Sequence, residues 1–155
     1  MYHWSFIYPT SSEDAIKFHA VIGPDSWLYQ KDEHFIARSK HACVVVQLSK
    51  SGPDIGSETL LIYKIFVADL PGTCTVDELD RVLCGVPLTS PAGDDETFTC
   101  RVWLRMAAAK LHEARIINCL DPNDLEGELK RLASQNNQRS LTGLGFTLHK
   151  SHICP

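Results

Sequence analysis

Hydrophobic and polar residues alternate along the start of the chain, and the period of the pattern changes further on. The stretch "HWSFIY" has a period of two, which is typical of a strand with two unlike faces. One face carries His3, Ser5 and Ile7, and the other carries Trp4, Phe6 and Tyr8. After the turn-forming residues "PTSSED", the segment "IKFHAVIG" is predicted to return as a second strand, and "SWLYQ" to follow as a third.

Two apolar stretches complete the predicted sheet. "HACVVVQLS" is rich in β-branched residues, and "TLLIYKIFVADL" is a long apolar run. The Gly, Ser and Pro residues of "SKSGPDIGSE" between them predict a hairpin loop. We therefore expect strands over residues 2–68, forming an antiparallel sheet of about five strands.

The period then becomes helical, over residues 75–137. "TVDELDRVLCGV" begins with Thr75 and has Glu78 three residues later, a capping box that predicts a helix start. A second helix is predicted to begin between Thr97 and Thr99, and "DPNDLEGELKRL" predicts a third, with an Asp cap and Pro in the first turn. Residues 140–155 have no clear period and form either a last strand or a docked tail. The chain thus reads as one α+β domain, residues 1–155, with helices packed on a sheet.

Composition narrows the function classes. Fifteen Lys and Arg against nineteen Asp and Glu give a net charge of −4 with no basic block, so we expect no nucleic-acid partner. We recognise no secretory signal and no apolar run long enough to span a membrane, and we expect a cytoplasmic protein. The cysteines are then expected to be free thiols, and without a C-x-x-C pair we expect no metal and no cofactor. They are Cys43, Cys74, Cys84, Cys100, Cys119 and Cys154.

Cys100 has the best physical case for reactivity among these thiols. Its predicted place in the first turn of a helix puts partly positive backbone N–H groups beside the sulfur, and Arg101 adds to that field. Acyl chemistry also needs a base, and His3 and His19 lie on predicted adjacent strands. Cys100 can equally be a small buried hydrophobe, His19 a core histidine and His3 a frayed terminal residue.

A resemblance strengthens the catalytic interpretation. The chain resembles the circularly permuted papain-like superfamily, in particular the lecithin retinol acyltransferase-like proteins. There a His-Trp pair opens a strand, a second histidine follows one strand later, and a cysteine begins the helix after the sheet. This chain keeps the order of first histidine, second histidine and cysteine from residue 3 to about residue 111, in "HWSFIY", the "KFHAVIG" of the second strand and "TCRVW". The chain is also similar to a group of small uncharacterised fungal proteins that share the His-Ala pair, a following Trp and "CRVW".

The resemblance implies a permuted papain-like fold and a set of roles. Cys100 is then the nucleophile, His3 the general base, and His19 the residue that orients it, with backbone amides near Cys100 as oxyanion donors. Thr99 stands where those proteins have Asn. The substrate would be a small molecule or an acyl or peptidyl group, and hydrolysis, transfer and cyclisation all stay open.

Two other functions remain open at this point. The same fold can serve as a non-enzymatic module that binds a small molecule or a protein. Alternatively, His149, His152 and Cys154 near the end of the chain have spacings that could bind a metal, although a solvated tail is the commoner explanation. Trp4, Trp27 and Trp103 are candidates for the wall of a substrate site, or for the core. The acidic run Asp94, Asp95 and Glu96 precedes Cys100, and its charge would oppose a thiolate.

Overall fold

The fold is described from a computed structural model of the chain. The structure describes residues 3–10, 14–36, 43–49, 64–69, 74–141 and 148–150. Its elements follow the order of strands and then helices that the sequence predicts, closed by one more short strand. They are β1 (His3–Pro9), β2 (Asp14–Ile22), β3 (Trp27–Ile36), β4 (Cys43–Ser49), β5 (Lys64–Asp69), α1 (Val76–Cys84), α2 (Cys100–Glu113), α3 (Pro122–Leu141) and β6 (Leu148–Lys150).

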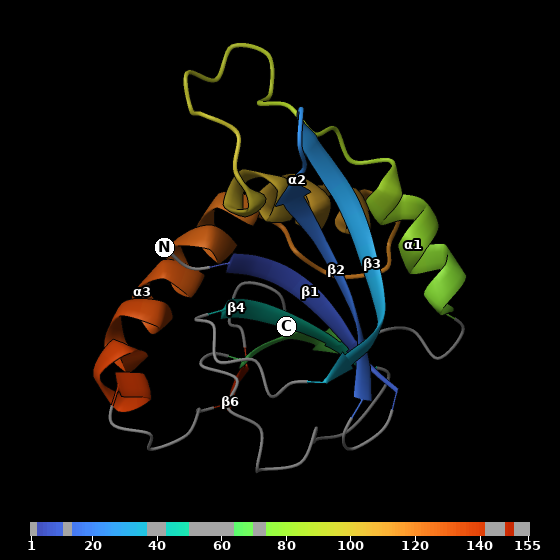
Figure 1. Cartoon of the computed structure of the whole chain (residues 1–155). Helices are drawn as coiled ribbons and strands as arrows, with labels where there is room; N and C mark the ends of the chain where they lie inside the picture. The colour runs from blue at the N-terminus through green and yellow to red at the C-terminus, as the bar shows by residue number, and fades with distance from the viewer. Residues whose placement is uncertain are drawn as a thin grey trace.

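The strands form one mixed sheet in the order β3-β2-β1-β4-β5-β6 (Figure 1). β1, β2 and β3 pair antiparallel, as predicted, but β4 pairs parallel to β1, β5 to β4 and β6 to β5. The prediction of an antiparallel sheet of about five strands is therefore correct for its first three strands only. The composition of "SKSGPDIGSE" indicated a hairpin, but turn-forming residues do not fix the direction of the next strand when the connection is longer than a hairpin loop.

The helices begin where the sequence places them, because each start has a side chain that caps free backbone N–H groups. Thr75 Oγ1 accepts from the N–H of Glu78 at 3.2 Å, and the Glu78 carboxylate accepts from the N–H of Thr75 at 2.9 Å. At the start of α3, Asp121 Oδ1 accepts from the N–H of Asn123 at 2.8 Å. Such caps satisfy donors that the helix leaves unpaired and so fix its first residue. None of the described helices is both long and apolar enough to cross a bilayer.

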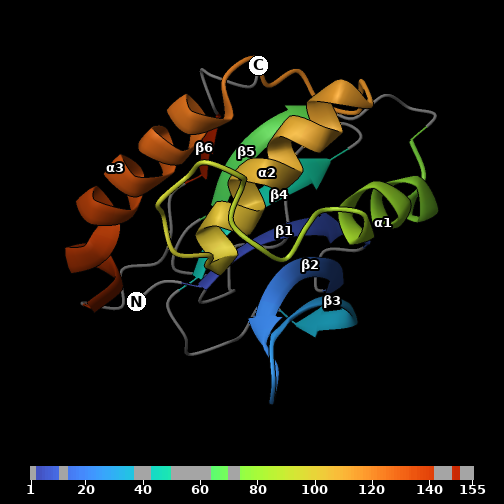
Figure 2. The same cartoon turned by 90° about the horizontal axis from the view of Figure 1, so that it is seen from above.

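α2 lies across the sheet, between α1 on one side and α3 on the other (Figure 2). Its buried stripe includes Cys100, Leu104, Ala107 and Leu111, as the helical period predicts. The side chains that meet this stripe from the sheet come from alternate positions, so one face of β1 and β2 belongs to the helix layer. They are Trp4, Phe6, Phe18 and Ala20. This helix-side core fixes which side chains of the two strands are left for the opposite face.

Candidate active site

The first turn of α2 holds the candidate nucleophile. Thr99 is the N-cap in an extended conformation, and its Oγ1 accepts from the N–H of Val102 at 3.4 Å. Cys100 is the first helical residue, so the prediction that it lies in the first turn of a helix is confirmed. The signal was local, since a threonine before an amphipathic stripe indicates a helix start by itself.

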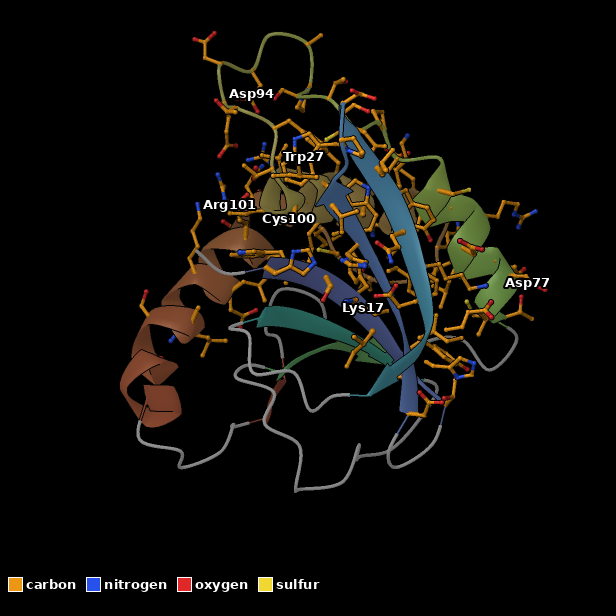
Figure 3. All side chains as sticks on the ribbon, in the orientation of Figure 1. Lys17, Trp27, Asp77, Asp94, Cys100 and Arg101 are labelled. Atoms are coloured by element: carbon orange, nitrogen blue, oxygen red, sulfur yellow. The ribbon has the colours of Figure 1, made fainter. Side chains whose placement is uncertain are left out.

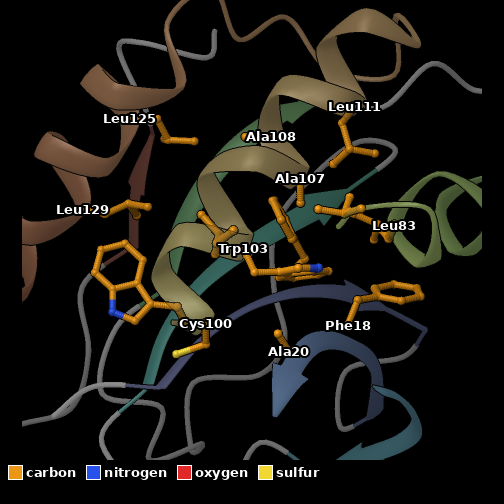
Figure 4. Packing of buried hydrophobic residues seen from close by; sticks show 14 of the residues in the cluster. Phe18, Ala20, Leu83, Cys100, Trp103, Ala107, Ala108, Leu111, Leu125 and Leu129 are labelled. Atoms are coloured by element: carbon orange, nitrogen blue, oxygen red, sulfur yellow. The ribbon is translucent and has the colours of Figure 1, made fainter. Parts of the chain in front are cut away.

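Cys100 is buried on the helix side of the sheet. Its exposed fraction is 9%, and it belongs to the same packed cluster as Trp4 and Ala20 (Figure 4). Burial raises the pKa of the thiol, while the backbone amides of Trp4, Arg101 and Cys100 and the charge of Arg101 oppose that rise without reversing it. The helix start was expected to favour a thiolate; in this arrangement desolvation prevails and Cys100 is a neutral thiol.

The two candidate histidines are in direct contact, as the sequence predicted. His3 Nε2 lies 2.6 Å from His19 Nδ1, a hydrogen bond in which one ring donates and the other accepts. The rings meet edge to face, with centroids 4.8 Å apart and planes at 83°. His3 comes from the first position of β1 and His19 from the neighbouring strand β2, so adjacent strands hold the pair.

A carboxylate and a lysine extend the histidine pair. Asp32 Oδ2 on β3 lies 3.2 Å from His19 Nε2, and it lies 2.8 Å from Lys17 Nζ. The Asp32–His19 contact is electrostatic rather than a well-aligned hydrogen bond, because the ring N–H has no aligned acceptor. Gln30 Nε2 donates to the other carboxylate oxygen at 2.6 Å. Burial alone raises the pKa of Asp32, but Lys17, His19 and Gln30 together hold it below its usual value.

Sequence reasoning missed Asp32 and Lys17. A signal existed, because Lys17 and His19 are two positions apart on β2 and so share a face. Asp32 is the cross-strand partner of Lys17 on β3. Finding it required the register of the β2–β3 pair, which the sequence pattern did not supply, since a bulge between Ala15 and Lys17 shifts that register.

Both histidines are neutral at physiological pH. Burial lowers the pKa of His19 to about 4, helped by the charges of Lys17 and His3 and opposed by Asp32. Burial also lowers the pKa of His3, again with help from Lys17 and against Asp32. The pair is therefore two uncharged imidazoles beside a charged carboxylate, and not the imidazolium that a preformed thiolate would accompany.

The thiol and the imidazoles lie on different faces of the sheet, although the residues that pack with Cys100 are chain neighbours of the two histidines. Trp4 and Ala20 pack with Cys100, so the alternation of a strand turns the neighbouring His3 and His19 the other way. Cys100 therefore faces the strand that carries His19, as predicted, while the imidazole of His19 does not face the thiol. No hydrogen bond joins Cys100 to either of these two rings in the described structure.

The pairing of β1 with β2 does not extend to the end of β1 that carries His3 and Trp4. Its register runs from Pro9 opposite Ala15 to Phe6 opposite Phe18 and is not continued to His3. The backbone N–H of Trp4 is directed to the sulfur of Cys100 instead. The ends of the two strands are thus joined by the His3–His19 hydrogen bond and lie beside the first turn of α2.

Two members of the acidic run before Cys100, Asp94 and Glu96, pair with arginines of α2. Arg101 pairs with Glu96 and with Glu126 of α3, and Arg105 lies 3.0 Å from Asp94, 3.1 Å from Glu96 and 3.3 Å from Glu126. Figure 3 shows Arg101 beside Cys100, with Asp94 on the loop above them. The hydrogen bond from Arg101 lowers the pKa of Glu96. These pairs reduce the repulsion of a thiolate that was expected from Asp94 and Glu96.

The three tryptophans lie mainly in the core. Trp103 is fully enclosed, with ring centroids 6.1 Å from Phe6 and 5.9 Å from Tyr29, and Trp4 is buried beside it in the same cluster. The ring of Trp103 has no exposed surface in this structure, and its candidate role as a wall of a substrate site stays a prediction. Trp27 is half-buried and meets Phe98 edge to face at 5.3 Å, so its substrate role stays a prediction.

Four of the six cysteines can be assigned. Cys74, Cys84, Cys100 and Cys119 form no disulfide, which agrees with the expectation for these four. The side chain of Cys43 and the tail residues His152 and Cys154 lie outside the described residues, as does the side chain of His149. Among the described side chains, no group of three or more His, Cys, Asp or Glu converges to hold a metal ion.

Comparisons with protein-family models, with curated proteins and with solved structures found no match to this chain. The resemblance to the permuted papain-like superfamily therefore stays a prediction.

Proposed function

We propose that the chain carries out cysteine-dependent acyl chemistry in a permuted papain-like fold, with Cys100 as the nucleophile and His3 as the general base. The observation that carries the proposal is the 2.6 Å hydrogen bond between His3 and His19, with Asp32 3.2 Å beyond. In nucleophilic catalysis the base is typically held by a second polar group, and that group is held in turn by a carboxylate. His3, His19 and Asp32 are arranged in this order.

The contacts define one consistent set of protons. Asp32 is a carboxylate, so His19 keeps its proton on Nε2, which faces that carboxylate. Nδ1 of His19 is then an acceptor, and His3 donates to it from Nε2. This leaves Nδ1 of His3 as an unprotonated nitrogen. His3 is thus oriented to accept a proton; the negative charge of Asp32 favours the imidazolium that forms, and the positive charge of Lys17 disfavours it.

The reaction would proceed in two steps. The sulfur of Cys100 attacks the carbonyl carbon of an ester, thioester or amide while its proton passes to Nδ1 of His3, and backbone N–H groups at the start of α2 bind the oxyanion. The leaving group takes that proton as its bond to carbon breaks, giving an acyl thioester on Cys100. Water or another nucleophile then attacks the thioester, returns a proton through His3 and releases Cys100 as a thiol.

The resting arrangement sets a condition on this chemistry. Cys100 and both histidines are neutral, and in the described structure no hydrogen bond joins Cys100 to either ring. Proton transfer therefore requires the ring of His3 to turn toward the sulfur beside Trp4, where β1 is not paired with β2. His3 is half-buried at the first position of its strand, so it is the more easily moved ring; His19 is 4% exposed and lies inside the sheet.

The test is acylation of the thiol by an activated ester such as p-nitrophenyl acetate, followed by mass spectrometry of the labelled peptide. We expect the acetyl group on Cys100, and acylation about a hundredfold slower in His3→Ala, because a positioned base contributes roughly 10² or more. His19→Ala should have a smaller effect. Exposed Cys84 serves as an internal reference for ordinary thiol reactivity. Equal labelling of Cys100 in the unaltered protein and in His3→Ala would overturn the proposal.

A non-enzymatic binding module is the second candidate, and the neutral, buried thiol favours it. In that case Cys100 is a packing residue, and the His3–His19–Asp32 contacts are a structural polar cluster inside the sheet. Cys100→Ala would then leave ligand binding intact. An acyl enzyme would instead lose all turnover with the same substitution, so this variant separates the two functions.

A further inference from the structure

We propose that Glu126 of α3 is a positioning residue for Cys100: it holds Arg101 against the start of α2 and keeps the charges around the thiol in balance. This role rests on the proposed use of Cys100 as the nucleophile. Glu126 touches no reacting atom, and its connection to Cys100 runs through Arg101, which follows Cys100 in the chain. Its role is therefore to position a charge and not to take part in the reaction.

Glu126 has unusual surroundings for a carboxylate on a helix. It is only 5% exposed, and it pairs with Arg101, with Arg105 at 3.3 Å and with Lys130 at 2.5 Å. A buried carboxylate loses much of its hydration, and it stays charged only where cations replace that loss. Glu126 is therefore the centre of the cluster, since it alone among the described carboxylates contacts all three cations.

The cluster is balanced in charge. Its cations are Arg101, Arg105 and Lys130, and its anions are Asp94, Glu96 and Glu126, three of each. It connects the loop before α2, the first two turns of α2 and the second turn of α3. Removing the charge of Glu126 makes the cluster more positive by one unit, and removing Arg101 makes it more negative by one unit.

The other charged groups around Cys100 do not compensate for such a change. On the sheet side, His3 and His19 are neutral, and Asp32 is already paired with Lys17. On α1, Asp80 is paired with Lys31 at 3.5 Å and also accepts a hydrogen bond from Tyr29. The cluster at the start of α2 is thus the local source of charge that a single substitution can unbalance.

The experiment is the rate of Cys100 alkylation by iodoacetamide, followed from pH 6.5 to 10.5 in the intact chain. The midpoint of the profile reports the ionisation of the thiol, and its upper plateau reports access to the sulfur. We expect Glu126→Gln to lower the midpoint by about half a pH unit, so that alkylation at neutral pH is about three times faster. Arg101→Gln should raise the midpoint by a similar amount, and the double variant should return it close to the original value.

Two controls separate this role from mere stabilisation. Glu126→Asp keeps the charge and should keep the midpoint, which a purely steric role would not predict. Glu113→Gln removes a carboxylate that pairs with Lys110 at the end of α2 opposite Cys100. This variant should change neither the midpoint nor the plateau. If Glu126→Gln fails to fold, Glu96→Gln gives the same test, because Glu96 also pairs with Arg101 and is more exposed.

An unchanged or raised midpoint in Glu126→Gln would overturn the role of Glu126. A higher plateau with an unchanged midpoint would also overturn it, since that result means only looser packing around the sulfur. These outcomes are independent of the acylation test, because the alkylation midpoint is measured without an acyl substrate in proteins that all retain His3. Failure of the proposed function and failure of the charge-balancing role can therefore be distinguished.

Discussion

The two faces of β1 and β2 differ in what they do to titratable groups. On the helix side an acid, Cys100, is buried among apolar side chains, and on the other side two bases, His3 and His19, are buried among polar ones. Desolvation is the largest effect on both faces, and it raises the pKa of the acid while it lowers the pKa of the bases. The same physical cause thus keeps both partners of the proposed reaction uncharged until they meet.

The faces also differ in what holds them together. Helix-side stability comes from packing of aromatic and aliphatic surface, which is insensitive to pH. The histidine side relies on hydrogen bonds and charges that depend on protonation.

The largest expected effect is on the helix side. Trp103 is fully enclosed between Phe6 and Tyr29, so Trp103→Ala should lower the free energy of unfolding by about 3–5 kcal/mol. Urea unfolding followed by circular dichroism measures the loss. Trp27→Ala is the matched control, because Trp27 is only half-buried and should cost clearly less. Equal losses in the two variants would contradict the central place of Trp103 in the core.

Acid should weaken the histidine side. His19 has a pKa of about 4 in the folded chain and about 6.5 when unfolded, so the unfolded chain takes up its proton first as the pH falls. The contribution is complete above pH 6.5 and is lost between 6.5 and 4. From pH 7 to pH 5 the free energy of unfolding should fall by about 2 kcal/mol from this residue, at about 1.4 kcal/mol per unit.

The measurement is unfolding by urea at several pH values, compared with two substitutions. His19→Gln should flatten the pH dependence, because the titrating ring is gone. His34→Gln should leave the slope as it is, because His34 is 89% exposed beside Asp14. If the unaltered protein and His19→Gln lose stability in parallel between pH 7 and pH 5, His19 is not the group that titrates.

The smallest effect concerns the helix start that carries the thiol. Thr99→Ala removes the hydroxyl that caps α2 and should cost about 1 kcal/mol of unfolding free energy, whereas Thr99→Ser keeps the hydroxyl and should cost much less. Thermal unfolding of the two variants side by side measures the difference. A Ser variant as unstable as the Ala variant would mean that the methyl group of Thr99, and not its hydroxyl, stabilises the helix start.

The sequence by itself determined the local features of this protein. Thr75, Thr99 and Asp121 mark the three helix starts because a capping side chain acts on N–H groups within three residues of itself. Alternation in "HWSFIY" separated the faces of β1 for the same reason, since neighbouring side chains of a strand point in opposite directions. The contact of His3 with His19 was also within reach, because a short connection makes their strands neighbours.

Only the tertiary structure decided the features that depend on distant segments. Three such features are the parallel direction of β4 and β5, the position of Asp32 beside His19, and the pairing of Arg101 with Glu126. In each of them the residues in contact are far enough apart in the chain that the sequence leaves many arrangements open. The charge state of Cys100 is the sharpest case. The helix start and Arg101 favour a thiolate, but burial under the packed helices costs more, and burial is a property of the whole fold.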